Sequence, residues 1–251
     1  ALHADQAREL QRLALALGLS VAVDYEYRAV PLFMQAARLL QAGAVGTPWL
    51  VKLDWLMGSR ADPQRGWNWY AQADQGGGVI GALGTHAVDM LAWLIGPLGA
   101  VQALNGVSIK QRPHPDGGLA AVDAPDVSLL QTVAHWQGRQ DLPVPAQVSL
   151  SSVSRNGRGF CLDVVGSSGS LMLSSTNQKD YVHGFELQHA PLGEPFRAVE
   201  ADADLAYPQT WSDGRIAPVV RVLGWWAESI RSGQPMLPGL AEGVASRVAC
   251  D

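Results

Sequence analysis

The sequence has 251 residues, of which 47% are hydrophobic, and a formal net charge of −5. This composition can build a sizeable core. Its fifteen arginines and three lysines are scattered along the chain, so we expect no nucleic acid partner. No apolar run reaches the roughly 18 residues of a membrane span, and no signal peptide pattern opens the chain, so we expect a cytoplasmic protein without a membrane segment. The two cysteines, Cys161 and Cys250, show neither metal-binding spacing nor a disulfide framework.

The sequence pattern in the first part of the chain predicts two helices and two strands. Residues 4–17 form a helical pattern with Leu10, Leu13 and Leu17 on one face, and residues 19–25 predict a short buried strand. Pro31 begins a second helix that ends at Gly43. Residues 49–56 alternate as a strand does, with Trp49, Val51, Leu53 and Trp55 on one face and with Lys52 and Asp54 on the other.

The rest of the chain predicts a third helix, a series of strands and two closing helices. The third helix runs from Thr85 to Gly96. Strands are expected over residues 101–109, 127–136, 147–153, 160–165, 171–174, 185–189 and 197–200, with an exposed, mobile loop between the first two. The closing helices cover residues 219–230 and 240–248. This order favours an α+β domain with a largely antiparallel sheet, helices on one face, and the other face packed on a second subunit.

His86 is the candidate acid or base. With Thr85 as N-cap, the imidazole would lie near the positive end of a helix dipole, which favours its neutral form near pH 7. Asp89, three residues on, would lie on the same face and hold the ring. The alternative is a histidine at a helix start that only satisfies the capping interactions there.

Three other segments carry residues that are candidates for a functional site. Gly76, Gly78 and Gly81 satisfy the dinucleotide-binding pattern GxGxxG, but no buried strand precedes them and no acidic residue follows at the required distance, so we interpret the match as accidental. An aromatic cluster is formed by Trp67, Trp69 and Tyr70. We expect these side chains either to stack against a ring-bearing substrate or to pack in the core. Tyr25, Glu26 and Arg28 end a predicted strand, where ligand contacts gather, although Arg28 could equally pair with Glu26. The other histidines show no metal-ligand spacing.

Several segments together resemble the Gfo/Idh/MocA family of NAD(P)-dependent oxidoreductases. They are VDYEYR, PLFMQAARLLQAGAVGTP, WNWY, GGGVIGALGTHAVDMLAWLIG and DVVGSSGSLMLSS. The resemblance implies an N-terminal Rossmann domain, a C-terminal α+β domain whose open sheet forms dimers or tetramers, and a small-molecule substrate between them. We therefore expect residues 1–27 to be the last helix and strand of a mostly missing Rossmann domain, and residues 28–251 to be the substrate-binding and oligomerisation domain. NAD or NADP would bind the full-length protein, and this fragment would be inactive without it.

The resemblance also assigns roles to residues. Family members often carry an aspartate four residues before the histidine, and this chain has Ala82 there. His86 then remains as the catalytic proton-transfer residue, with Asp89 orienting its ring or capping the helix, and with Glu26 as a replacement carboxylate. Tyr25, Glu26, Arg28, Trp67, Trp69 and Asp89 are the expected substrate-binding residues. The implied activity is a dehydrogenase acting on a hydroxyl or carbonyl of a sugar, polyol or related molecule. The alternatives are a nucleotide-responsive regulator or binding protein on the same scaffold, and an oligomerisation module.

Overall fold

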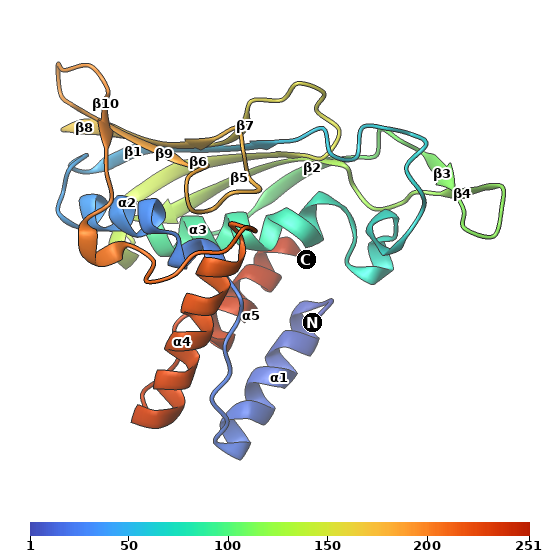
Figure 1. Ribbon diagram of the computed structural model, residues 1–251, viewed down its shortest axis with the longest axis horizontal. Coiled ribbons are helices and arrows are strands. Elements are labelled where there is room, and N and C mark those ends of the chain that lie inside the picture. Colours follow the sequence, from blue (N-terminus) through green and yellow to red (C-terminus); the bar gives the residue numbers. More distant parts are fainter.

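A computed structural model describes all residues from Ala1 to Asp251. Its centre is an eight-stranded sheet with the order β10-β9-β8-β7-β1-β6-β5-β2 (Figure 1). The strands are β1 (Pro48–Leu56), β2 (Gln102–Gly106), β5 (Val127–His135), β6 (Pro143–Ser151), β7 (Gly159–Gly166), β8 (Gly169–Ser175), β9 (Glu186–Pro191) and β10 (Arg197–Val199). Every neighbouring pair is antiparallel except β1 and β6. The predicted strand series is therefore confirmed, with shifted ends.

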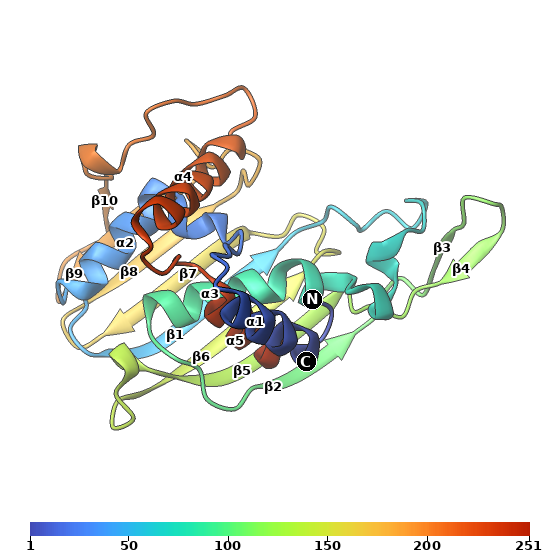
Figure 2. The same cartoon turned by 90° about the horizontal axis from the view of Figure 1, so that it is seen from below.

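The helices all lie on one side of this sheet (Figure 1). They are α1 (Ala4–Leu17), α2 (Pro31–Gln41), α3 (Thr85–Leu94), α4 (Ile216–Ser232) and α5 (Leu240–Cys250). Helices α2 and α3 run along the sheet, and α1, α4 and α5 lie beyond them, as the view from below shows (Figure 2). The opposite face carries no helix. This is the mixed, mostly antiparallel architecture expected from the sequence.

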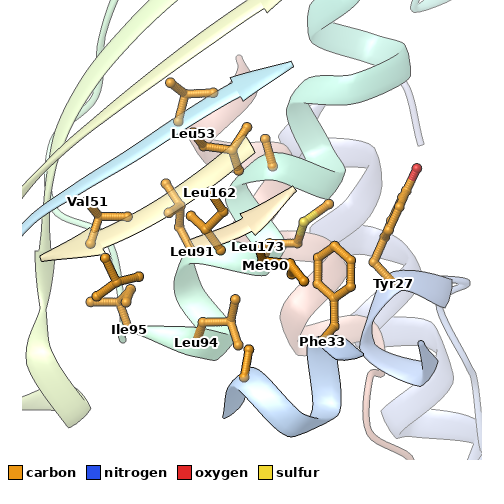
Figure 3. Close-up of a cluster of buried hydrophobic side chains, with 14 of the residues drawn as sticks. Tyr27, Phe33, Val51, Leu53, Met90, Leu91, Leu94, Ile95, Leu162 and Leu173 are labelled. Atoms are coloured by element: carbon orange, nitrogen blue, oxygen red, sulfur yellow. The ribbon is translucent and has the colours of Figure 1, made fainter. Parts of the chain in front are cut away.

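The core lies between the sheet and helices α2 and α3 (Figure 3). Leu53 of β1 is paired with Leu162 of β7, and both are fully buried. Phe33 of α2 and Leu91 of α3 pack against them from the helical layer. Burying each such side chain contributes about 1.5–3 kcal/mol, so this contact fixes the position of α3 on the sheet.

One detail of β1 differs from the alternation in the sequence. Val51, Leu53 and Trp55 are buried as predicted, but Trp49 is 61% exposed. The pairing of β1 with β7 shifts its register between Pro48 and Leu50. Such an irregularity reverses the faces of the residues beyond it, so the prediction that Trp49 shares the buried face is wrong.

The start of the helix that carries His86 also differs from the prediction. The helix begins at Gly78, passes through a wide π turn over Ile80–Gly84 and continues into α3. Gly76 and Gly78 have φ of 71° and 74°, and a Cβ on Gly81 would lie 1.8 Å from the carbonyl oxygen of Gly76. Glycines are therefore required for this turn. Thr85 is not an N-cap, and His86 lies inside the helix rather than near its positive end.

Two further segments differ from their predicted secondary structure. Residues 19–24 are extended but belong to no strand, because no neighbouring strand pairs with them. The predicted loop between β2 and β5 contains a hairpin made of β3 (Gln111–Pro113) and β4 (Leu119–Ala121), which projects from the molecule (Figure 2). Local sequence patterns do not show whether a partner strand will be present.

Helix α1 buries alanines and leaves its leucines exposed. Its buried residues are Ala4, Ala7 and Ala14, on the side that contacts α5, whereas Leu10, Leu13 and Leu17 are exposed. Small side chains allow the two helices to approach closely, and the leucines remain available on the outer face.

The helical stretch over residues 73–94 is long and apolar enough to cross a membrane, but more than half of its apolar window is buried, as in a core helix.

Candidate active site around His86

His86 lies where α3 meets the short 3₁₀ helix Glu26–Ala29. Its Nδ1 atom is buried, has no hydrogen-bond partner, and lies 3.7 Å from Oε2 of Glu26. The rings of Tyr25 and Tyr27 contact the imidazole edge to face, with centroid distances of 5.6 Å and 5.4 Å. The chain thus brings one carboxyl group beside the histidine, within an aromatic wall. We refer to these two residues as the Glu26–His86 pair.

Burial shifts the pKa of both members of this pair toward the neutral form. The pKa of His86 is lowered to about 4, because burial disfavours the imidazolium. The pKa of Glu26 is raised to about 7, chiefly by burial and further by the charges of Asp24 and Asp89. The predicted neutral state of His86 therefore has a different cause, since no helix terminus is near it. A carboxyl group with a pKa near neutrality is suited to exchanging protons there.

Asp89 does not hold the imidazole. Its two oxygens accept hydrogen bonds from Nε and Nη2 of Arg28, at 2.8 Å and 2.7 Å, and both side chains are largely buried. Burial raises the pKa of Asp89, and the hydrogen bonds from Arg28 oppose this shift. The predictions that Asp89 orients His86 and that Arg28 could pair with Glu26 are therefore wrong. This ion pair instead joins the 3₁₀ helix to α3, and it thereby sets the separation of Glu26 from His86.

A cavity of about 290 Å³ opens beside His86. Its lining comes from α1, the extended segment before Tyr25, α3 and α5, and includes Asp24, Tyr25, Thr85, His86 and Arg247. Sequence reasoning missed Asp24, Thr85 and Arg247 as candidate ligand contacts. Arg247 is far from His86 in the sequence, so no spacing pattern could have linked them. A larger cavity of about 720 Å³ lies between α1 and α4, but no titratable side chain lines it.

Trp67 and Trp69 are not among the residues that line the cavity beside His86. The indole nitrogen of Trp67 donates a hydrogen bond to the carbonyl of Ala121 in the projecting hairpin, and its ring packs against His114. Trp69 is half-exposed and contacts Tyr70. The loop therefore places both tryptophans beside the hairpin, and the structure does not bring these two expected substrate-binding residues to the cavity beside His86.

The glycine-rich turn does not fit the phosphates of a nicotinamide cofactor. Two 3₁₀ turns precede it, over Trp69–Ala71 and Ala73–Gln75, where a dinucleotide site needs a strand. Gly77 faces the carbonyl oxygens of Trp69, Tyr70 and Gln72, which would repel a phosphate group. No three His, Cys, Asp or Glu side chains are grouped as metal ligands. The chemistry that the Glu26–His86 pair offers is proton transfer and hydrogen bonding.

The sequence family model of the GFO/IDH/MocA C-terminal domain matches residues 33–172, more than half of the chain. The chain belongs to the GFO/IDH/MocA family. An uncharacterized oxidoreductase of Synechocystis sp. is 42% identical over 253 residues, which cover 100% of this chain and 66% of that protein. This GFO/IDH/MocA chain therefore spans just under two thirds of the length of its relative.

Levoglucosan dehydrogenase is similar to this chain both in sequence and in structure. Levoglucosan dehydrogenase of Pseudarthrobacter phenanthrenivorans is 31% identical over 101 residues, or 40% of this chain and 26% of that enzyme. A solved structure of levoglucosan dehydrogenase in complex with NADH and L-sorbose matches with a TM-score of 0.85 at 20% identity, covering 100% of this chain and 68% of the other. At this identity the structural match establishes that the fold is shared.

Proposed function

We propose that this chain is the substrate-binding part of an NAD(P)-dependent dehydrogenase that acts on a hydroxyl or carbonyl group of a sugar, polyol or related small molecule. The observation that carries the proposal is the Glu26–His86 pair, in which a buried imidazole nitrogen without a hydrogen-bond partner faces a carboxyl group beside a cavity. The family membership and the similarity to levoglucosan dehydrogenase support the reaction class.

We infer that the nicotinamide cofactor is held by residues outside these 251. The glycine-rich turn faces carbonyl oxygens, and the relatives are about half as long again as this chain. Leu15, Leu17 and Leu19 are exposed and provide an apolar face for such a part. This is the arrangement expected if residues 1–27 belong to the cofactor domain and residues 28–251 form the substrate domain.

The proton chemistry follows from the electrostatics of the pair. A substrate hydroxyl bound in the cavity would transfer its proton to the imidazole of His86, whose pKa is too low for it to be protonated already. The nicotinamide, when bound, would accept the hydride from the carbon that bears this hydroxyl. The proton on Nδ1 passes to the carboxylate of Glu26, whose pKa of about 7 leaves it partly ionised at neutral pH. In the direction of reduction the same proton moves back. Tyr25, Asp24, Thr85 and Arg247 offer hydrogen-bonding groups to the other hydroxyls of the substrate.

The decisive experiment compares His86→Gln with the unaltered protein, each within the polypeptide that carries this chain. Cofactor reduction is followed by absorbance against a panel of sugars and polyols. Removing a general base costs 100-fold to 10,000-fold in rate, so we expect kcat to fall by at least about 100-fold. His183→Gln, at an exposed histidine, is the matched control. Equal turnover in His86→Gln and the control would contradict the proposal.

We also propose that the helix-free sheet face binds a second copy of the chain. Leu104 of β2 and Leu129 of β5 are cross-strand partners on this face, and they are 70% and 42% exposed. Exposed apolar pairs on an open sheet favour burial against another surface.

A further inference from the structure

The ion pairs of this chain leave one local excess of positive charge. Ten of the fifteen arginines have a carboxylate oxygen within 4.0 Å. Of the five that do not, four gather around the turn Ser59–Asp62, namely Arg60, Arg65, Arg112 and Arg155. We refer to these four residues as the arginine cluster. Arg60 and Arg65 belong to the loop after β1, Arg112 to strand β3 of the projecting hairpin, and Arg155 to the segment between β6 and β7.

Hydrogen bonds to the turn hold three members of the cluster in place. The carbonyl oxygen of Ser59 accepts from Arg65, those of Arg60 and Asp62 accept from Arg112, and that of Ala61 accepts from Arg155, at 2.7–2.9 Å. Four consecutive carbonyl groups thus anchor three guanidinium groups. Each guanidinium has five N–H donors, and the exposed Arg65 and Arg155 each use only one of theirs on the turn.

Arg60, the fourth member, has no side-chain hydrogen bond of its own. Its guanidinium lies over the ring of Tyr70, with 3.9 Å from Cζ to the ring centroid. Stacking on an aromatic ring orients the group without using its N–H donors. Arg60 is half-buried and Arg65 and Arg155 are exposed, so a ligand from solvent can reach them.

The charges of the cluster are not balanced within the chain. Arg112 is only 6% exposed, and the carboxylates that act on it at longer range are those of Asp62 and Asp126. These two carboxylates already accept hydrogen bonds from the backbone N–H groups of Gln64, Ser108 and Ile109. Four guanidinium groups against two carboxylates leave a surplus of two positive charges. Burial and the charge of Arg65 both lower the pKa of Arg60.

We propose that the arginine cluster is a binding site for a multivalent oxyanion, a small ligand that carries phosphate or carboxylate groups. The planar donor pairs of arginine match such oxygens, and the anchored turn presents them at no cost in ordering the loop. A bound anion would also relieve the repulsion among the four cations. The site is separate from the Glu26–His86 pair and does not depend on the proposed dehydrogenase activity.

Titration calorimetry of the chain with inorganic pyrophosphate and with citrate tests the proposal. The two ligands distinguish phosphate from carboxylate, and sodium chloride at matched ionic strength controls for screening. We expect Arg60→Gln to weaken binding of the preferred ligand by at least 10-fold, and Arg60→Gln with Arg155→Gln to abolish it. Arg139→Gln, at an exposed arginine paired with Asp141, should leave binding unchanged.

Arg60→Gln removes no hydrogen bond, so this variant keeps the turn intact even if Arg155→Gln disturbs it. An unchanged melting temperature without ligand verifies this. Two results would overturn the proposal. One is a heat of titration with pyrophosphate and citrate no larger than that with sodium chloride at the same ionic strength, and the other is unchanged affinity in Arg60→Gln.

Discussion

Replacing Glu26 by glutamine tests how the pair is built, because it removes the ionisable group and keeps the size of the side chain. The pKa of Glu26 is raised from 4.5 to about 7, so the folded state holds its proton more tightly than the unfolded state does. The penalty appears as the pH rises from 4.5 and is complete above about 7. At 1.36 kcal/mol for each pKa unit, it amounts to about 3 kcal/mol at most.

We therefore expect Glu26→Gln to be more stable than the unaltered chain at pH 8, by up to about 3 kcal/mol, and equally stable at pH 4. Urea unfolding followed by circular dichroism at several pH values measures the difference. Glu228→Gln, at an exposed glutamate, is the control, and we expect its stability difference from the unaltered chain to be small at both pH values. A stability gain that does not change with pH, or a loss at pH 8, would refute the reasoning, since either result requires that the Glu26 carboxylate ionises at no cost.

Two further predictions concern the Arg28–Asp89 ion pair and the open sheet face. Asp89→Asn leaves the largely buried Arg28 without its carboxylate, and we expect a loss of about 3–5 kcal/mol in unfolding free energy, whereas Asp141→Asn at an exposed pair should cost less than about 1 kcal/mol. Equal losses in the two variants would contradict the buried role of Asp89. Leu104→Glu with Leu129→Glu places two charges on the open face, and we expect light scattering to show a lower molar mass than for the unaltered chain. A molar mass equal to that of one chain before any substitution would rule out self-association through this face.

Most of the secondary structure can be predicted from the sequence. Hydrophobic alternation located β1, β5, β7 and β8, and helical spacing located α2 and α4, because these patterns reflect burial against one large layer. Sequence analysis also singled out His86, Glu26, Arg28 and Asp89, and it expected the Glu26 carboxylate at the His86 site, but it assigned Asp89 to His86 instead of Arg28. Asp89 is three residues from His86 on one helix, yet its carboxylate turns to Arg28, because a buried carboxylate is stabilised more by a bidentate guanidinium than by a neutral imidazole.

The remaining features depend on contacts between distant parts of the chain. The glycines of the turn at Gly76–Gly81 allow the helix to begin earlier than Thr85, which removes the helix terminus that the sequence placed beside His86. The extended residues 19–24, the outer leucines of α1 and the arginine cluster depend on which neighbours are present or absent in space. Such neighbours come from distant parts of the chain, so a local pattern can place a residue on an element but cannot say which charge or side chain will face it.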